Sequence, residues 1–270
     1  MSLKKLQIYQ KLVEGQVDLA QLTNKQINRY ARQISLKKIG VVGQKKLLSS
    51  KILIIGAGGL GSPISIYLAG MGIGHIGIVD HDIINISNIH RQILFQNSDI
   101  KKKKVSVAKK KLEKINPNIK IKPYNLKLDK FNIKKVAQSY EIIIDGSDNF
   151  KTRFLVNEYC IKNKKILISG AISKFDGHVY TFNFKKKNSP CLRCFMPNMP
   201  NDNRLDCELN GVMGSLGGII GSIQANEVVK EILNIGESLC GYILIIDSLN
   251  LNFRKVKLNK NTKCKCNNYE

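Results

Sequence analysis

Two features near the start of this sequence could hold a nucleotide. The stretch "KILIIGAGGLGSP" is an apolar run that breaks into glycines at Gly56, Gly58, Gly59 and Gly61. The spacing matches G-x-G-x-x-G, in which glycines allow a tight turn and let a phosphate approach the backbone N–H groups at a helix N-terminus. Asp80 ends the next apolar run, where a carboxylate can accept hydrogen bonds from ribose hydroxyls. These features predict a nucleotide site but do not distinguish NAD from ATP.

Charged residues further along the chain favour ATP. Asn88 and Arg91 lie three positions apart in "SNIHRQ", and an amide beside a guanidinium suits phosphate oxygens better than a nicotinamide ring. Lys104 begins a helical pattern in "KVSVAKKKL". Asp145 and Asp148 follow a buried strand, at the sheet edge where open α/β folds bind ligands. A carboxylate there could hold Mg²⁺. Asp148 is the preferred ligand, because Asp145 could instead cap the turn.

Cysteine spacing indicates a metal site. Four of the seven cysteines form two close pairs, Cys191/Cys194 and Cys264/Cys266. The N-terminal segment has no signal-peptide core, so we expect a cytoplasmic protein without a disulfide framework.

The composition limits the kinds of binding partner that we expect. The chain has 270 residues and a formal net charge of +24, which raises the question of nucleic acid. Lys, Asn and Ile are abundant along the whole sequence, a pattern that fits a coding bias and solvated faces, so we do not expect a nucleic-acid partner. An acidic protein partner is the intermediate alternative. Apolar segments fall short of a membrane span of about 18 residues.

Strand and helix patterns alternate up to about residue 170, which predicts an α/β, Rossmann-like, doubly wound and mostly parallel sheet. Later residues change to antiparallel strands. Among them "GHVYTFNF" alternates polar and apolar residues, which is typical of a strand with one face in water. We expect an N-terminal helical extension over residues 1–22 and a single domain over 23–270. Its nucleotide-binding part would cover about 23–170 and its partner-binding part about 171–270.

The order of these motifs resembles that of the ubiquitin-activating-enzyme superfamily. The motifs are "RYARQI", "GAGGLGS", "VDHD…SNIHRQ", Lys104, "DGSDN" and the cysteine pairs. More narrowly, the chain resembles the MoeB/ThiF/HesA group of sulfur-carrier-protein adenylyltransferases. The resemblance implies adenylylation, with ATP, of the C-terminal Gly carboxylate of a ubiquitin-like carrier ending in Gly-Gly, in molybdopterin or thiamine biosynthesis.

The resemblance also implies roles for matched residues. Asp80 would hold the ribose, the glycine turn the nucleotide backbone, and Asp148 Mg²⁺. Asn88, Arg91 and Lys104 would hold the triphosphate. Arg32 would reach into the active site of the partner subunit of a homodimer.

The four paired cysteines would bind a structural Zn²⁺. The second pair is C-x-C where the family usually has C-x-x-C, which leaves open three-thiolate ligation or loss of the metal. Cys207 falls where the family carries a crossover-loop cysteine, which is catalytic in some relatives only. No rhodanese-like segment follows Cys266, so we expect a separate sulfur donor, such as a cysteine desulfurase or a rhodanese.

Three alternatives stay open. One is a tRNA- or peptide-modifying member of the same superfamily. The second is an NAD-dependent oxidoreductase, which the phosphate-binding cations disfavour. The third is a zinc-stabilised scaffold with an inactive nucleotide site, which intact Arg91, Lys104 and Asp148 disfavour.

Overall fold

The computed structural model describes residues 22–200, 211–264 and 266–267. Almost all of the expected N-terminal helical extension, and Cys207, lie outside these residues. Within them, no helix combines the length and the apolar character that crossing a membrane requires.

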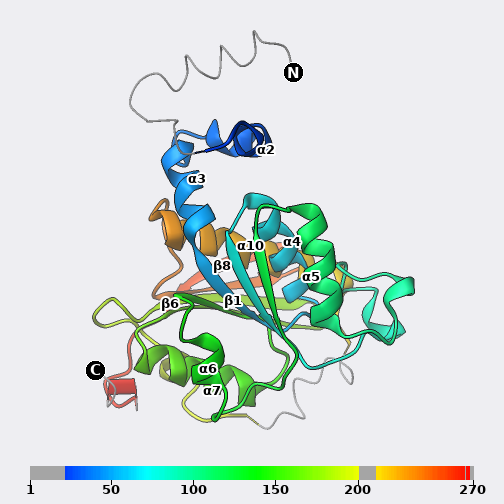
Figure 1. Cartoon of the computed structure of the whole chain (residues 1–270). Helices are drawn as coiled ribbons and strands as arrows, with labels where there is room; N and C mark the ends of the chain where they lie inside the picture. The colour runs from blue at the N-terminus through cyan, green and yellow to red at the C-terminus, as the bar shows by residue number, and fades with distance from the viewer. Residues whose placement is uncertain (1–21, 201–210, 265, 268–270) are drawn as a thin grey trace.

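The centre of the molecule is one eight-stranded sheet in the order β3-β2-β1-β4-β5-β6-β7-β8 (Figure 1). Strands β3, β2, β1, β4 and β5 pair in parallel, and β5 to β8 pair antiparallel. The change from parallel to antiparallel at β5 confirms the predicted fold class. The strand bounds are β1 Lys51–Ile55, β2 His75–Val79, β3 Lys120–Tyr124, β4 Ile142–Asp145, β5 Ile166–Ser173, β6 Asp176–Asn183, β7 Tyr242–Asp247 and β8 Asn252–Lys257.

Helices cover both faces of the sheet (Figure 1). Successive residues of a strand point to opposite faces, so Ile52 and Ile54 of β1 enter one core and Leu53 and Ile55 the other. The α-helices are α2 Asn24–Ile34, α3 Gly40–Ser49, α4 Gly61–Met71, α5 Lys104–Ile115, α6 Ile133–Ala137, α7 Phe150–Lys162, α8 Leu192–Phe195 and α10 Gly214–Leu233. Helices α4, α5 and α10 contribute to the first core, and α6 and α7 contribute to the second.

Local signals position the helix ends. Thr23 caps α2 with a capping box, in which its side chain accepts from Gln26 N and Gln26 reaches back to Thr23 N. Helix α4 ends at Gly72, whose φ of 85° is the left-handed conformation that glycine adopts without strain.

The prediction of a wet face on β6 is wrong. Tyr180, Thr181 and Phe182 are all buried, because α10 covers the face that carries Thr181 and the second core covers the face that carries Tyr180 and Phe182. The polar side chains that indicated water bond to helix α10 instead. Thr181 Oγ1 donates to Glu227 Oε2 at 2.8 Å, and Asn183 Nδ2 donates to Glu231 Oε2 at 2.9 Å. The alternating polar residues of β6 therefore form hydrogen bonds to a helix and do not mark a face in water.

Candidate nucleotide site

The glycine turn joins β1 to α4 at the carboxyl edge of the parallel strands. Gly56 has φ +92°, and a Cβ added there would lie 2.8 Å from Gly146 O. A Cβ on Gly61 would lie 1.9 Å from Gly56 O, so the first and last glycines are needed for the turn to close. Gly58 and Gly59 line the pocket in front of α4, whereas Gly61 does not. The turn therefore presents backbone at the start of a helix, where phosphate binds favourably.

Asp80 fastens this turn to the end of β2. Its Oδ2 accepts from Ala57 N at 2.7 Å, and its Oδ1 accepts from Asp82 N at 2.8 Å. Each carboxylate oxygen has a second lone pair, and Asp80 lines the pocket. The Asp80 carboxylate therefore still has acceptor sites for ribose hydroxyls, as the sequence predicts. The structure shows a second role for Asp80, which is to hold the glycine turn in place.

Lys104 and Arg91 are two of the cationic side chains that line the same pocket. Lys104 begins α5 and is 5% exposed, and its Nζ is 2.8 Å from Asp82 Oδ2. Arg91 Nη1 donates to Ser87 O at 3.1 Å and lies 2.9 Å from His90 Nε2. Both positive charges are therefore held at the pocket wall by neighbouring acceptors.

Asn88 does not line the pocket. It ends the 3₁₀ turn η2 (Ile86–Asn88), where its Oδ1 accepts from Asn85 N at 3.3 Å. A backbone hydrogen bond closes the same turn, in which Asn88 N donates to Asn85 O at 3.0 Å. In this structure Asn88 shapes the segment that carries Arg91, and its expected contact with the triphosphate stays a prediction.

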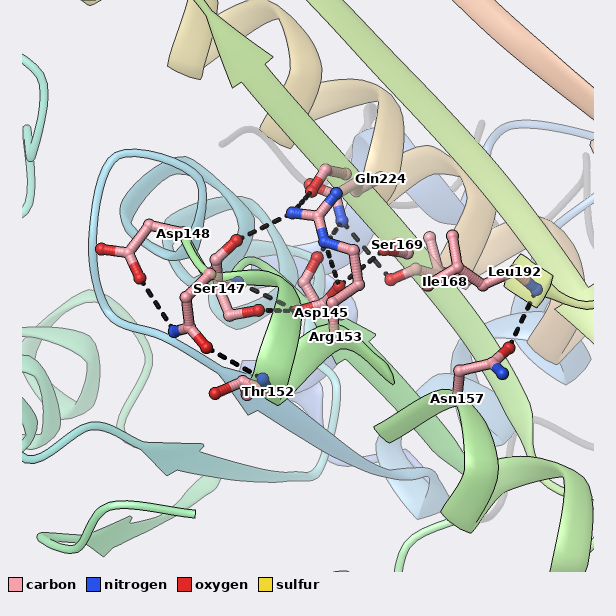
Figure 2. Close-up of polar contacts among 12 residues, drawn as sticks. Asp145, Ser147, Asp148, Thr152, Arg153, Asn157, Ile168, Ser169, Leu192 and Gln224 are labelled. Atoms are coloured by element: carbon pink, nitrogen blue, oxygen red, sulfur yellow. Dashed lines mark hydrogen bonds and ion pairs between the residues drawn. The ribbon is translucent and has the colours of Figure 1, made fainter. Parts of the chain in front are cut away.

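The aspartate that ends β4 and the one that follows in the next turn have different surroundings (Figure 2). Asp145 is fully buried and accepts from Ser147 N (3.0 Å), Ser147 Oγ (2.5 Å) and Ser169 Oγ (2.6 Å). Asp148 is exposed at the pocket, and its carboxylate points away from the cluster around Asp145. Its Oδ1 accepts from Asn149 Nδ2 at 3.2 Å. Of the two, Asp148 has the oxygens available for a hard cation, so it is the residue that fits Mg²⁺.

Arg153 is a site residue that the sequence reading missed. It comes from α7 and is 5% exposed. Its Nη2 donates to Ser147 O and Gly170 O, each at 2.9 Å, and its Nε lies 3.4 Å from Asp145 Oδ2. Arg153 thus ties the turn that carries Asp148 to Gly170 of β5 (Figure 2). Its signal was present in "DGSDNFKTR", where an arginine follows the second aspartate by five residues.

Arg32 is exposed on α2 and is not among the residues that line the pocket. Helix α2 packs at the far end of α4, where Tyr30 lies against Gly72. The pocket lies at the N-terminus of α4, an 11-residue helix with a length of about 16 Å. The chain's own fold does not bring Arg32 to its own site, so the expected role requires a second copy.

The four paired cysteines converge although 70 residues separate the pairs. One ligand atom of each lies within 4.8 Å of the others. Cys191 Sγ is 3.7 Å from Cys264 Sγ and 3.8 Å from Cys194 Sγ, and Cys194 Sγ is 3.8 Å from Cys266 Sγ. Tetrahedral ligation with Zn–S of about 2.3 Å places sulfurs about 3.8 Å apart. The C-x-C pair therefore still presents two thiols to one point, and the donor set fits zinc.

Hydrogen bonds within this cluster favour a thiolate. The Cys191 thiol, together with the Cys191 backbone N–H 3.4 Å from Cys194 Sγ, lowers the pKa of Cys194 to about 5. Burial raises the pKa of Cys266 to about 12. Metal ligation requires deprotonated sulfur, and the hydrogen bonds inside the cluster favour that form at Cys194.

Comparison with known proteins agrees with this geometry. The ThiF family profile matches residues 30–268. The chain belongs to the ThiF family. It is 37% identical to the sulfur carrier protein adenylyltransferase of Thermus thermophilus over 246 residues. These aligned residues make up 90% of this chain and 91% of that protein.

Other relatives are longer. The probable molybdopterin-synthase adenylyltransferase of Porphyra purpurea is 44% identical to this ThiF-family chain. The alignment covers 85% of this chain and 60% of the Porphyra protein. The adenylyltransferase and sulfurtransferase MOCS3 of Culex quinquefasciatus is 40% identical to this chain. The alignment covers 89% of this chain but only 55% of the length of that relative. Among solved structures, E. coli MccB with AMPCPP and MccA superposes with a TM-score of 0.78 and 26% identity, covering 88% of this chain and 74% of MccB.

Proposed function

We propose that this ThiF-family chain uses ATP to adenylylate the C-terminal Gly carboxylate of a ubiquitin-like sulfur carrier. The proposal rests on the set of residues that line one pocket. It is lined by the glycine turn at the N-terminus of α4, by two cations, Arg91 and Lys104, and by the exposed carboxylate of Asp148. The name of the Thermus relative supports the same activity.

The chemistry needs no general base. The carrier carboxylate is already ionised at neutral pH, and one of its oxygens attacks the α-phosphorus of ATP. A carboxylate O–P bond forms, the bond between the α-phosphorus and the bridging oxygen breaks, and pyrophosphate leaves with the electron pair. Arg91 and Lys104 counter the negative charge that repels the attacking group and that grows on pyrophosphate. Asp148 would bind Mg²⁺, which supplies further charge neutralisation when present.

The proposal includes partners. The activated carrier would receive sulfur from a separate donor, such as a cysteine desulfurase or a rhodanese. The enzyme would be a homodimer in which Arg32 enters the partner's site. Molybdopterin and thiamine carriers are the two candidate substrates that the family resemblance implies. One relative is named for molybdopterin synthase and another for a sulfur carrier protein in general.

Carrier-dependent ATP–pyrophosphate exchange tests the activity. We expect exchange with at least one ubiquitin-like carrier ending in Gly-Gly, and none with a carrier lacking its last glycine. Lys104→Met should lower the exchange rate about 100-fold, because a buried cation at the phosphates is removed. Lys103→Met is the matched control, since Lys103 is the adjacent exposed lysine and should leave the rate unchanged. Absence of exchange with every carrier tested would refute the proposal, and exchange with a peptide alone would favour the peptide-modifying alternative.

We further propose that Cys191, Cys194, Cys264 and Cys266 bind one structural Zn²⁺. The purified chain should contain one zinc per molecule, measured by atomic emission. Cys191→Ser should release it and lower the melting temperature, because the metal joins the segment before α8 to the C-terminal residues. Cys240→Ser is the control, since Cys240 lies outside the cluster and should retain zinc. Full zinc content in Cys191→Ser would show that this ligand set is wrong.

A further inference from the structure

The excess of lysine over acidic residues is concentrated in one segment of the chain. Residues 101–135 contain 14 lysines and 2 acidic residues, Glu113 and Asp129, so the segment has a formal net charge of +12. The whole chain has +24, so half of the net charge lies in 35 of its 270 residues. A bias toward lysine codons alone would spread this charge along the chain. The concentration therefore indicates a local basic surface.

This segment lies at one edge of the sheet. It contains β3, an edge strand that pairs only with β2. Helix α5 covers one face of the sheet and α6 the other (Figure 1). Lysines on an edge strand prevent pairing with another strand, which accounts for Lys120 and Lys122 of β3. It does not account for the lysines of the two helices. We call residues 101–135 the lysine edge.

Most lysines of the lysine edge have no carboxylate partner. Eleven of the 14 are exposed. The other three, Lys104, Lys109 and Lys111, each pair with a carboxylate. Among the eleven, Lys102 alone forms an ion pair with a residue that the structure describes, at 3.9 Å from Asp99 Oδ1. The exposed positive charge is therefore available to a partner from solution.

A groove along α5 brings several of these charges together. Lys102, Lys110, Lys111 and Lys114 line it, and Asp99 is the one acidic residue in its lining. Lys111 Nζ lies 2.5 Å from Asp99 Oδ2, so this acid is already neutralised. Lys110 and Lys114 are four residues apart and share one face of the helix. A groove with several unneutralised lysines suits a chain of phosphates, which lysine binds as a point charge.

An exposed aromatic ring favours nucleic acid over an acidic protein. Phe131, just before α6, is 83% exposed, the largest exposure of any large apolar side chain in the described residues. Lys130 Nζ lies 4.9 Å from the centre of its ring. Lysines that bind phosphates beside a ring on which a base can stack are typical of surfaces for single-stranded nucleic acid. A partner that offered only carboxylates would leave this ring in water.

We propose that the lysine edge binds single-stranded nucleic acid, with phosphates on its exposed lysines and a base stacked on Phe131. This proposal replaces the expectation, drawn from composition, that no nucleic acid binds. Because charge and stacking carry no base code, binding has little sequence preference. It is also separate from adenylylation, since the groove on α5 shares no lining residue with the nucleotide pocket.

Fluorescence anisotropy with labelled oligouridylate and oligothymidylate tests the proposal, without ATP or carrier. We expect both probes to bind the full chain. About four neutralised phosphates on a single strand predict a loss of affinity of about 50-fold between about 50 and 200 mM salt. Equal affinity for the two probes identifies a general single-strand surface, and tighter binding of one identifies RNA or DNA as the ligand.

Two variants locate the binding surface. Lys110→Gln combined with Lys114→Gln removes two exposed charges, and we expect about tenfold weaker binding with a shallower salt dependence. Lys186→Gln combined with Lys187→Gln is the matched control, because these two lysines are exposed but lie outside the lysine edge. Phe131→Ala should weaken both probes about tenfold and leave the binding of inorganic polyphosphate unchanged, because polyphosphate has no bases.

Three results would overturn the proposal. One is no binding of either probe at low salt. The second is an equal loss in the α5 double variant and its control, which would show that the lysine edge is not the binding surface. The third is polyglutamate binding as tightly as oligouridylate, with no effect of Phe131→Ala, which would assign the lysine edge to an acidic protein. Binding of the probes by protein that exchanges with no carrier would contradict the proposed function and leave this proposal standing.

Discussion

Replacing Asp148 with alanine is expected to abolish ATP–pyrophosphate exchange, with a fall in rate of about 1000-fold or more. Asp148 is the exposed carboxylate of the pocket, whereas Asp145 is buried among hydrogen-bond donors. Removing it would remove the proposed magnesium ligand beside the reacting phosphate. ATP binding should weaken less than the rate, because the glycine turn, Arg91 and Lys104 remain. Exchange assays and calorimetry on the same preparation check both effects.

Asp148→Asn separates charge from shape. An amide keeps the size of the side chain but is a poor ligand for Mg²⁺, so we expect nearly the same loss as in Asp148→Ala and a higher magnesium requirement. The melting temperature should stay within about 2 °C of wild type, because Asp148 is exposed and surface changes cost little. Full exchange by either variant would show that another group binds the metal.

Replacing Arg153 with methionine is expected to destabilise the fold by about 3–5 kcal/mol, because it leaves the buried carboxylate of Asp145 without its cation. The change also removes the donor to Ser147 O and Gly170 O. For a chain of this size the melting temperature should fall by about 10 °C. Circular dichroism during heating measures this fall.

Two variants make the Arg153 test specific. Arg254→Met changes an exposed arginine of β8 and should move the melting temperature little. Asp145→Asn combined with Arg153→Met removes both charges of the pair and should recover part of the lost stability, since the uncompensated charge is gone. If Arg153→Met melted at the same temperature as Arg254→Met, the buried pair would not stabilise the turn.

The parallel part of the fold could be predicted from the sequence, because its signals are local. Apolar runs of four to six residues, caps such as Thr23 and breaks such as Gly72 mark the ends of elements in any context. Helix α7 begins at such a signal, because the side chain of Asn149 accepts from Thr152 N. For β6 the local signal misled, because polar residues on a strand look alike whether water or the carboxylates of α10 accept their hydrogen bonds.

The sequence by itself determined the nucleotide turn, since Gly56 has a positive φ and a Cβ on Gly61 would meet the nearby Gly56 O, and both constraints are local. It also determined the order of motifs that places this chain in its family. Only the tertiary structure decided which aspartate is exposed and which is buried, and that Arg153 holds the turn between them. These properties depend on contacts between strands and helices far apart in the sequence, and burial of a charge exists only once those elements have packed.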